Sequence, residues 1–234
     1  MLNELELTGR ARTHVVQRDD LKAAIHPDAL QPFLDMKADA ARAGIDIAVV
    51  SSFRDFPAQQ RIWDMKYRGE RVLYSADGET LDHAALAGDA LIDAILCWSA
   101  LPGASRHHWG SEIDVIDAAA RPEGYRVQLI ASEAAPGGVF HALHRWLDDH
   151  MAQYGFFRPY RTARGGVAPE PWHLSYAAVA VHAERALTPA VVAAAIEASD
   201  ILGKERILER LAELHARFVV NVDPPFAGSD SAAA

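Results

Sequence analysis

The spacing of hydrophobic and polar residues predicts helices that alternate with a few short strands. Four segments carry apolar residues at helical intervals: 29–44, 57–67, 90–100 and 138–154. Three others are β-branched or alternate between apolar and polar residues, as strands do: 45–52, 111–117 and 172–176. Gly44 and Gly155 stand where glycines commonly end helices. The pattern therefore predicts an α+β protein.

The strand predicted at 111–117 determines where one carboxylate points. Successive side chains of a strand alternate between its two faces. Ile113 and Val115 therefore share one face, and Glu112, Asp114 and Ile116 share the other. We expect the carboxylate of Asp114 to point away from the apolar pair.

A different pattern follows in the C-terminal part of the chain. Between residues 188 and 220 the spacing predicts two helices with a break near Gly203, which we interpret as a helical hairpin packed on the rest of the protein. Residues 223–234 carry too few apolar residues to form a core and are expected to be disordered. The predicted organisation is one domain, 1–222, with its core at about 29–180.

Composition narrows the class of protein. The 234 residues are 50% hydrophobic and 24% charged, which suits a soluble globular domain. The formal net charge of -9 is not offset by a local basic stripe, so nucleic acid is not an expected partner. Cys97 is the single cysteine, which excludes an intramolecular disulfide and a thiolate-rich metal site.

The sequence predicts neither a membrane span nor a secretory signal. No stretch reaches the roughly 20 apolar residues that a spanning helix needs. The N-terminal residues lack the basic and apolar regions of a signal peptide. As encoded, the chain is expected to be cytoplasmic, with periplasmic or extracellular action only by a route that it does not encode. The sequence does not predict its oligomeric state.

Two short motifs, far apart in the chain, supply candidate metal ligands. The first contains His107, His108 and Asp114, and the second ends with His173. Two imidazoles and one carboxylate suit zinc, and three protein ligands leave the open fourth position of a catalytic site. Adjacent residues of an extended segment point in opposite directions, so we expect only one of His107 and His108 to be a ligand. Spacing alone does not choose between them.

Glu170 is the candidate catalytic base. Pro169 and Pro171 flank it, which disfavours a helix and predicts an extended or turning segment. Three residues before His173, the Glu170 carboxylate could lie over the open side of the metal and activate water. The alternative is a solvated glutamate in a loop.

Arg54 and Trp172 are candidates for substrate contacts. Arg54 follows the strand predicted at 45–52, where its guanidinium could stabilise an oxyanion or hold a terminal carboxylate. Its alternative is a salt bridge, for example to Asp55. Trp172 belongs to an aromatic group that we expect to be mostly core, with some of it forming the pocket wall.

These motifs resemble those of a known family. Ser105-x-His107-x-x-Gly110-x-Glu112-x-Asp114 resembles the S-x-H-x-x-G-x-A-x-D motif of the zinc D-alanyl-D-alanine carboxypeptidases and dipeptidases, the VanY-like family. Glu170-x-Trp172-His173 is similar to its E-x-W-H motif, and Ser51-Ser52-Phe53-Arg54 to its S-G-Y-R segment. The resemblance covers about residues 29–180. It implies the fold shared with the hedgehog signalling domain, a small antiparallel sheet that carries the zinc site and is flanked by helices.

The resemblance also implies a ligand set. His107, Asp114 and His173 would bind one zinc ion per chain, which decides between His107 and His108. Glu170 would be the catalytic base.

Two further roles and three departures follow from the same resemblance. Arg54 would contact the oxyanion or the substrate carboxylate, and Ser105 would form a hydrogen bond with the substrate. Glu112 replaces the usual alanine, Ser52 the usual glycine and Phe53 the usual tyrosine. These departures could reshape the pocket and alter the preferred peptide.

We therefore expect a zinc metallo-carboxypeptidase that hydrolyses D-alanyl-D-alanine-type bonds in peptidoglycan stem peptides, its expected partner. One alternative is a peptidoglycan endopeptidase of the same fold. Another is a zinc-containing binding module that has lost catalysis, which the presence of Glu170 and Arg54 disfavours because a structural zinc site needs neither.

Overall fold

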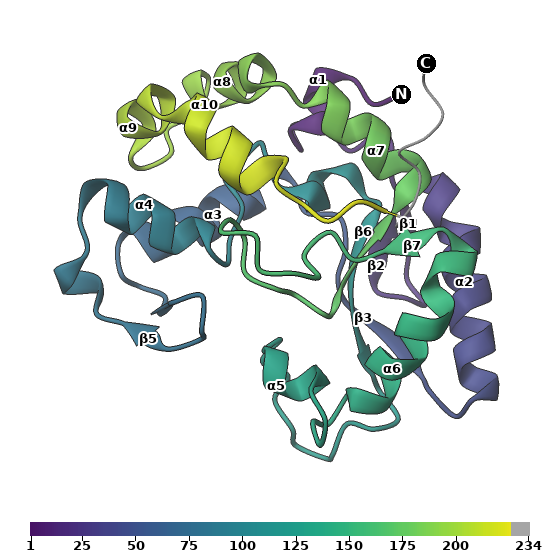
Figure 1. Ribbon diagram of the computed structural model, residues 1–234. Coiled ribbons are helices and arrows are strands. Elements are labelled where there is room, and N and C mark those ends of the chain that lie inside the picture. The colour runs from purple at the N-terminus through teal and green to yellow at the C-terminus, as the bar shows by residue number, and fades with distance from the viewer. Residues whose placement is uncertain (226–234) are drawn as a thin grey trace, which may run out of the picture.

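A four-stranded antiparallel sheet forms the centre of the protein in the computed structural model (Figure 1). Its strands, in spatial order, are β3 (Ile47–Ser51), β6 (Glu112–Asp117), β8 (His173–Tyr176) and β7 (Phe156–Phe157). The prediction of an α+β protein with a small antiparallel sheet is confirmed. The structure describes residues 1–225, so most of the tail predicted at 223–234 lies outside the described residues.

Two helices, α2 (Pro27–Arg42) and α6 (His141–His150), cover one face of the sheet (Figure 1). Their apolar sides join those of the strands in one buried cluster, which includes Phe33, Met36, Ile113, Val115, Leu143, Leu147 and Leu174. Ile113 and Val115 are fully buried there, as the alternating pattern predicts. Alternation puts Glu112 and Asp114 on the opposite face of β6, so this part of the strand has one core face and one face with carboxylates.

A second group of helices packs around the other side of the sheet (Figure 1). Its members are α3 (Phe56–Tyr67), α4 (Gly88–Leu96), α7 (Ala177–Ala186), α8 (Pro189–Glu197), α9 (Lys204–Glu209) and α10 (Leu211–Leu214), continued by a π-helical turn, η4 (His215–Val219). They enclose a second apolar cluster, which includes Trp63, Ile92, Ile95, Ala180, Ile196 and Leu214.

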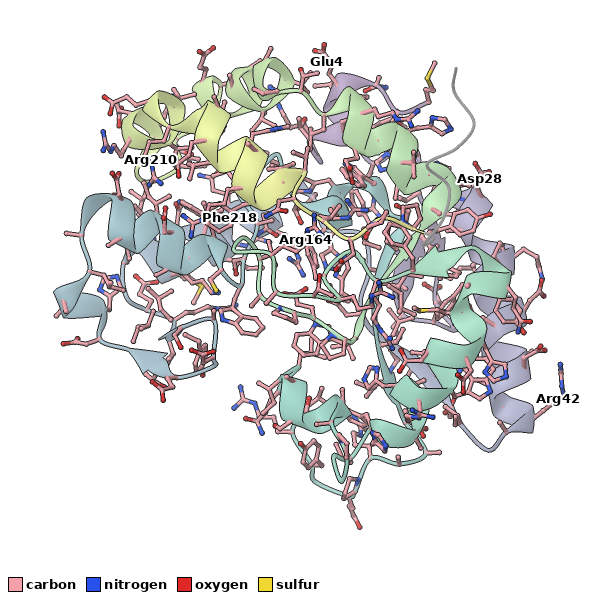
Figure 2. All side chains as sticks on the ribbon, in the orientation of Figure 1. Glu4, Asp28, Arg42, Arg164, Arg210 and Phe218 are labelled. Carbon is pink, nitrogen blue, oxygen red and sulfur yellow. The ribbon has the colours of Figure 1, made fainter. Side chains whose placement is uncertain are left out.

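The C-terminal helices follow the predicted hairpin, with more subdivisions. Gly203 has a φ of +79°, a left-handed conformation that favours glycine, and it separates α8 from α9. Arg210, labelled in Figure 2, ties the hairpin to α4 through Asp93 at 2.9 Å and Asp89 at 3.4 Å. Phe218, also labelled, is buried in the second apolar cluster. The hairpin is therefore part of the packed protein.

The remaining elements are short. They are α1 (Glu4–Leu7), β1 (Val16–Arg18), β2 (Ala23–Ile25), β4 (Leu73–Tyr74), β5 (Thr80–Leu81), η1 (His83–Ala85), η2 (Arg106–Trp109), α5 (Ala131–Ala134) and η3 (Met151–Tyr154). The predicted helix at 138–154 is α6 followed by the 3-10 turn η3, and it ends at Gly155 as expected. Most of the other short elements were not predicted, because two to four residues do not complete a recognisable period.

Within residues 1–225, no single helix combines the length and apolarity needed to cross a membrane. Only α7 and α8 taken together reach that length and composition, with a bend of 74° between them.

Arg158, a buried residue that directly follows β7, ties the loop before β8 to α6. Arg158 donates from Nη2 to His144 Nδ1 at 3.3 Å, forms an ion pair with Asp148, and donates from Nε to the carbonyl of Pro171 at 2.6 Å. Burial, reinforced by the positive charge of Arg158, lowers the pKa of His144 to about 3. His144 is therefore neutral in the folded protein and accepts the hydrogen bond from Arg158.

Because His144 is neutral in the folded state, we expect the protein to lose stability in acid. An unfolded histidine takes up its proton near pH 6.5, whereas folded His144 does so near 3. The contribution of His144 to stability is complete above about pH 6.5 and declines as the pH falls towards 3, because only the unfolded chain is protonated in that window. Between about pH 7.5 and pH 5 the free energy of unfolding should decrease by about 2 kcal/mol from this group.

Denaturant unfolding of wild type and His144→Gln at both pH values measures this effect. The variant should be less stable at neutral pH and less sensitive to acid by about that amount. His182→Gln is the matched control, because His182 is exposed on α7. The same pH dependence in wild type and His144→Gln would contradict the assignment.

Candidate active site

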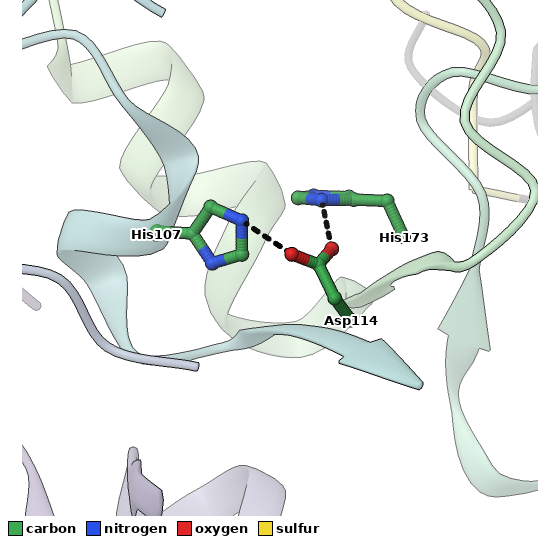
Figure 3. Close-up of side chains that lie close together, drawn as sticks. All are labelled: His107, Asp114 and His173. Atoms are coloured by element: carbon green, nitrogen blue, oxygen red, sulfur yellow. Dashed lines mark hydrogen bonds and ion pairs between the residues drawn. The ribbon is translucent and has the colours of Figure 1, made fainter. Parts of the chain in front are cut away.

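His107, Asp114 and His173 meet on the polar face of the sheet (Figure 3). Asp114 of β6 lies directly opposite His173 of β8 in the strand register, and His107 comes from the turn η2. The Asp114 carboxylate is 3.3 Å from His107 Nε2 through Oδ2 and 3.0 Å from His173 Nδ1 through Oδ1. One nitrogen or oxygen from each side chain lies within 4.8 Å of the others, and all three residues are buried. The three side chains could hold a metal ion.

The donor set fits zinc. Two imidazole nitrogens and one carboxylate oxygen are the ligands of many catalytic zinc sites, and three of them leave a position free. His107 Nδ1 donates to the carbonyl of Ser52 at 2.9 Å, which turns its Nε2 towards Asp114. A ligating histidine commonly donates its other nitrogen to a carbonyl in this way.

His108 is held in a different environment from His107. Its Nδ1 donates to the carbonyl of Arg54 at 2.6 Å, and its Nε2 accepts from the backbone N–H of Gly103 at 3.1 Å. The side chain is fully buried, and burial lowers its pKa to about 3. Because backbone groups occupy both ring nitrogens, the geometry favours His107 as the ligand.

The charges of the three side chains depend on one another. Burial alone would raise the pKa of Asp114, but His107 and His173 outweigh it and hold that pKa well below its usual range. Burial alone would lower the pKa of His173, but hydrogen bonds and charges from Asp114 and Glu112 raise it to about 10. Burial lowers the pKa of His107 despite the opposing charge of Asp114. The site therefore combines an ionised carboxylate with imidazoles in unlike environments.

Glu170 lies next to this triad without belonging to it. Its Oε2 is 3.7 Å from His173 Nδ1, and its side chain is 15% exposed. The segment is a turn, as its prolines predict: the N–H of His173 donates to the carbonyl of Glu170 at 3.1 Å, and the N–H of Glu170 donates to the carbonyl of Tyr160 at 2.9 Å. Burial, with a contribution from Asp114, raises the pKa of Glu170 to about 7 against the opposing charges of His173 and Arg54.

Arg54 is positioned by its backbone, whose N–H donates to the carbonyl of His107 in η2 at 3.1 Å. Within residues 1–225 its guanidinium forms no ion pair, and it donates to Gln59 Oε1 at 2.7 Å and Ser51 Oγ at 2.9 Å. Asp55 instead caps α3 by accepting from the N–H of Ala58 at 2.8 Å. Burial lowers the pKa of Arg54, while the nearby charges of Asp114 and Glu170 oppose this shift. The alternative of a salt bridge to Asp55 is therefore wrong.

Ser105 and Trp172 border the site from buried positions. Ser105 is 1% exposed, and its carbonyl accepts from the N–H of His108 at 3.0 Å at the start of η2. Trp172 is 5% exposed and stacks on Trp98 with ring centroids 6.5 Å apart. Its environment agrees with the expectation that the aromatic group is mostly core. The roles of Ser105 and Trp172 in substrate binding stay predictions.

Sequence reasoning assigned no contact in the site to two side chains that affect it. Glu112 is fully buried and lies 2.9 Å from His173 Nε2 through its Oε2. The alternation of β6, which already placed Glu112 on the face of Asp114, was the signal that could have found it. Lys66 of α3 was not singled out at all; burial lowers its pKa to about 8, against the charge of Glu170. No motif marks Lys66.

Comparison with known proteins finds similarity to D-alanyl-D-alanine carboxypeptidases. The VanY family model, described as D-alanyl-D-alanine carboxypeptidase, matches residues 22–179. An uncharacterised protein of Haemophilus influenzae is 31% identical over 122 residues, which are 51% of this chain and 93% of that protein. A D-alanyl-D-alanine carboxypeptidase of Enterococcus faecalis is 30% identical over 154 residues, 64% of this chain but only 47% of that protein. The chain thus spans about half the length of the enterococcal relative.

Among solved structures, the LdcB LD-carboxypeptidase has a TM-score of 0.51 and 22% identity, and the match covers 75% of both chains. At this identity the likeness concerns the fold alone.

The two adjacent histidines should respond differently to substitution. His107→Gln should weaken zinc binding by more than the roughly 100-fold that the loss of an outer hydrogen-bond partner can cost. His108→Gln should keep zinc affinity within about threefold but lower the free energy of unfolding by about 1–3 kcal/mol, because buried backbone groups lose their partner. Chelator competition and denaturant unfolding measure the two effects. Loss of zinc binding in His108→Gln with retention in His107→Gln would reverse the assignment.

Proposed function

The chain belongs to the VanY family of D-alanyl-D-alanine carboxypeptidases, a family of hydrolases that act on peptidoglycan peptides, and on this premise we propose that it is a zinc-dependent D,D-carboxypeptidase. Its substrate would be a peptidoglycan stem peptide that ends in D-alanyl-D-alanine, and its products the shortened peptide and free D-alanine. The observation that carries the proposal is the position of Glu170, beside the buried triad but outside it, with a pKa of about 7.

The residues that would hold the zinc ion are His107, Asp114 and His173. The chemistry that zinc supplies in such a site is Lewis acidity, which polarises a carbonyl group and brings the pKa of water close to about 7. As three protein ligands, they would leave a position open for catalysis. This is the one such cluster within residues 1–225, so the expected stoichiometry is one zinc ion per chain.

Glu170 would move the proton. A general base works best when its pKa lies near the working pH, because it can then both accept and return a proton. With a pKa of about 7, Glu170 could take a proton from the attacking water and deliver it to the amine nitrogen of the leaving D-alanine. The flanking prolines and the hydrogen bond to Tyr160 hold its backbone for this role.

Arg54 and Lys66 support a carboxypeptidase over an endopeptidase. A carboxypeptidase substrate carries a free carboxylate one residue from the scissile bond, and this charge needs a cation close to the base. The positive charges of Arg54 and Lys66 both oppose the rise in the pKa of Glu170, so both act within electrostatic range of its carboxylate. Arg54 can also donate to the oxyanion that forms on the carbonyl, since guanidinium groups present several N–H donors in one plane.

Product analysis tests the reaction. The zinc-loaded protein is incubated with a stem pentapeptide ending in D-alanyl-D-alanine, and with the same peptide amidated at its C-terminus. We expect free D-alanine from the first peptide, and at least about tenfold slower cleavage of the second, because a lost charge contact of this kind is worth roughly 1.5–3 kcal/mol. Cleavage at an internal bond, equal for both peptides, would identify an endopeptidase. Zinc binding without any cleavage would favour the binding module.

Glu170→Gln tests the role of the base. The amide cannot accept the proton, so kcat should decrease by about 10²–10⁴-fold. Zinc affinity should change little, because Glu170 is not one of the three ligands. Glu205→Gln, an exposed change on α9, is the control and should retain wild-type kcat. Activity within tenfold of wild type in Glu170→Gln would remove it from the mechanism.

A further inference from the structure

Four polar side chains stand in two facing pairs on the β6–β8 ribbon. The register pairs Asp114 with His173 and, two residues along, Glu112 with Ser175. Strand alternation puts all four on the same face, while Ile113 between the two acids is buried in the opposite core. Glu112 is thus brought to the ligands by the same geometry that places Asp114.

His173 lies between the two carboxylates. Its Nδ1 is 3.0 Å from Asp114 Oδ1, on the side of the triad, and its Nε2 is 2.9 Å from Glu112 Oε2, on the far side. Glu170 also approaches Nδ1, at 3.7 Å. Because Nε2 faces Glu112 at hydrogen-bond distance, Nδ1 is the nitrogen left to serve as a ligand.

The Glu112 carboxylate is fixed by three further donors. Ser175 Oγ and Ser111 Oγ donate to its Oε1 at 2.8 and 3.1 Å, and Arg106 Nε donates to its Oε2 at 3.2 Å. The side chain of Glu112 has no solvent exposure. A buried carboxylate is costly unless it is paired and fully hydrogen-bonded, and here it is both.

Arg106 is anchored in turn by contacts away from the site. It donates from Nη1 to Glu184 Oε2 on α7 at 2.8 Å and from Nη2 to Ser175 Oγ at 3.0 Å. Its guanidinium lies 4.7 Å from the ring centroid of Trp109. The position of Glu112 is therefore set by η2, β8 and α7 together.

We propose that Glu112 is a positioning residue for the metal centre: it accepts the Nε2–H of His173 and so holds the ring with Nδ1 on the side of Asp114, where this nitrogen would give up its proton and offer its lone pair to the metal. A carboxylate behind a ligating histidine fixes the ring and its tautomer and makes the ligand a stronger donor. This role rests on the proposed zinc function. It assigns a role to Glu112, which occupies the position where the family motif has alanine.

The competing interpretation is a purely structural ion pair between Glu112 and Arg106. Two glutamates contact this arginine, and only one of them touches His173. Glu184 is therefore a matched control, since Glu184→Gln removes a carboxylate from the same arginine without touching a ligand. If Glu112 were only structural, both variants would affect stability and neither would affect the metal.

The first experiment compares zinc affinity in wild type, Glu112→Gln and Glu184→Gln by competition with a chromophoric chelator, without substrate. We expect affinity about 10–100-fold weaker in Glu112→Gln and within about twofold of wild type in Glu184→Gln. With Co²⁺ in place of zinc, the visible absorption bands should shift in Glu112→Gln alone. Unchanged zinc affinity and unchanged bands in a folded Glu112→Gln would overturn the proposal.

A second measurement needs no variant. Long-range ¹H–¹⁵N spectra of the zinc-loaded wild type distinguish a histidine protonated on Nε2 from one protonated on Nδ1. His173 should carry its proton on Nε2, and a proton on Nδ1 would overturn the proposal even if Glu112→Gln fails to fold.

Both measurements separate this proposal from the proposed function. If Glu112→Gln releases D-alanine normally and binds zinc with unchanged affinity, the positioning role of Glu112 is wrong but the proposed function stands. If the wild type binds zinc with the expected tautomer but hydrolyses no substrate, the proposed function is wrong but the positioning role stands.

Discussion

The pairing of β6 with β8 is the constraint on which the site depends. The register sets Asp114 opposite His173 and leaves Ile113 and Leu174 on the core face. A slip of one residue would reverse the faces, burying carboxylates in the apolar cluster and exposing aliphatic side chains. The free energy that drives core formation therefore also selects the register that brings Asp114 and His173 together, although the two strands come from distant parts of the chain.

Burial of so many ionisable groups is tolerated because their charges are compensated locally. Arg106 balances Glu112 and Glu184, while Asp114 is balanced by the imidazoles on either side. Glu170 lies 3.7 Å from its partner His173, and burial raises its pKa to about 7 against the charge of that histidine. Neighbouring carboxylates in unlike environments can take unlike roles, one as an ionised ligand and one as a proton carrier.

The sequence predicted the elements that follow a clear period and the site residues that belong to motifs. The alternation of 111–117 was enough to orient Asp114, and the prolines around Glu170 correctly excluded a helix. Sequence reasoning could not find Lys66, because its approach to the site depends on how α3 packs. It likewise registered Glu112 only as a departure from a motif, since its partner Arg106 lies in a turn and its partner Ser175 in another strand. Such contacts are set by tertiary packing, which leaves no local pattern.

The least regular part of the site is the loop that carries Glu170, and its order comes from side chains that replace missing backbone pairing. Arg158 donates to the carbonyl of Pro171 beside Glu170, and Asp223 accepts from the backbone N–H groups of Arg161 at 2.9 Å and Thr162 at 2.8 Å. Sites on loops are usually less precise than sites on strands unless surrounding contacts fix them. Buried charged groups away from the triad thus have a function of their own: they fix the geometry of the loop that carries Glu170, as its proposed role in proton transfer requires.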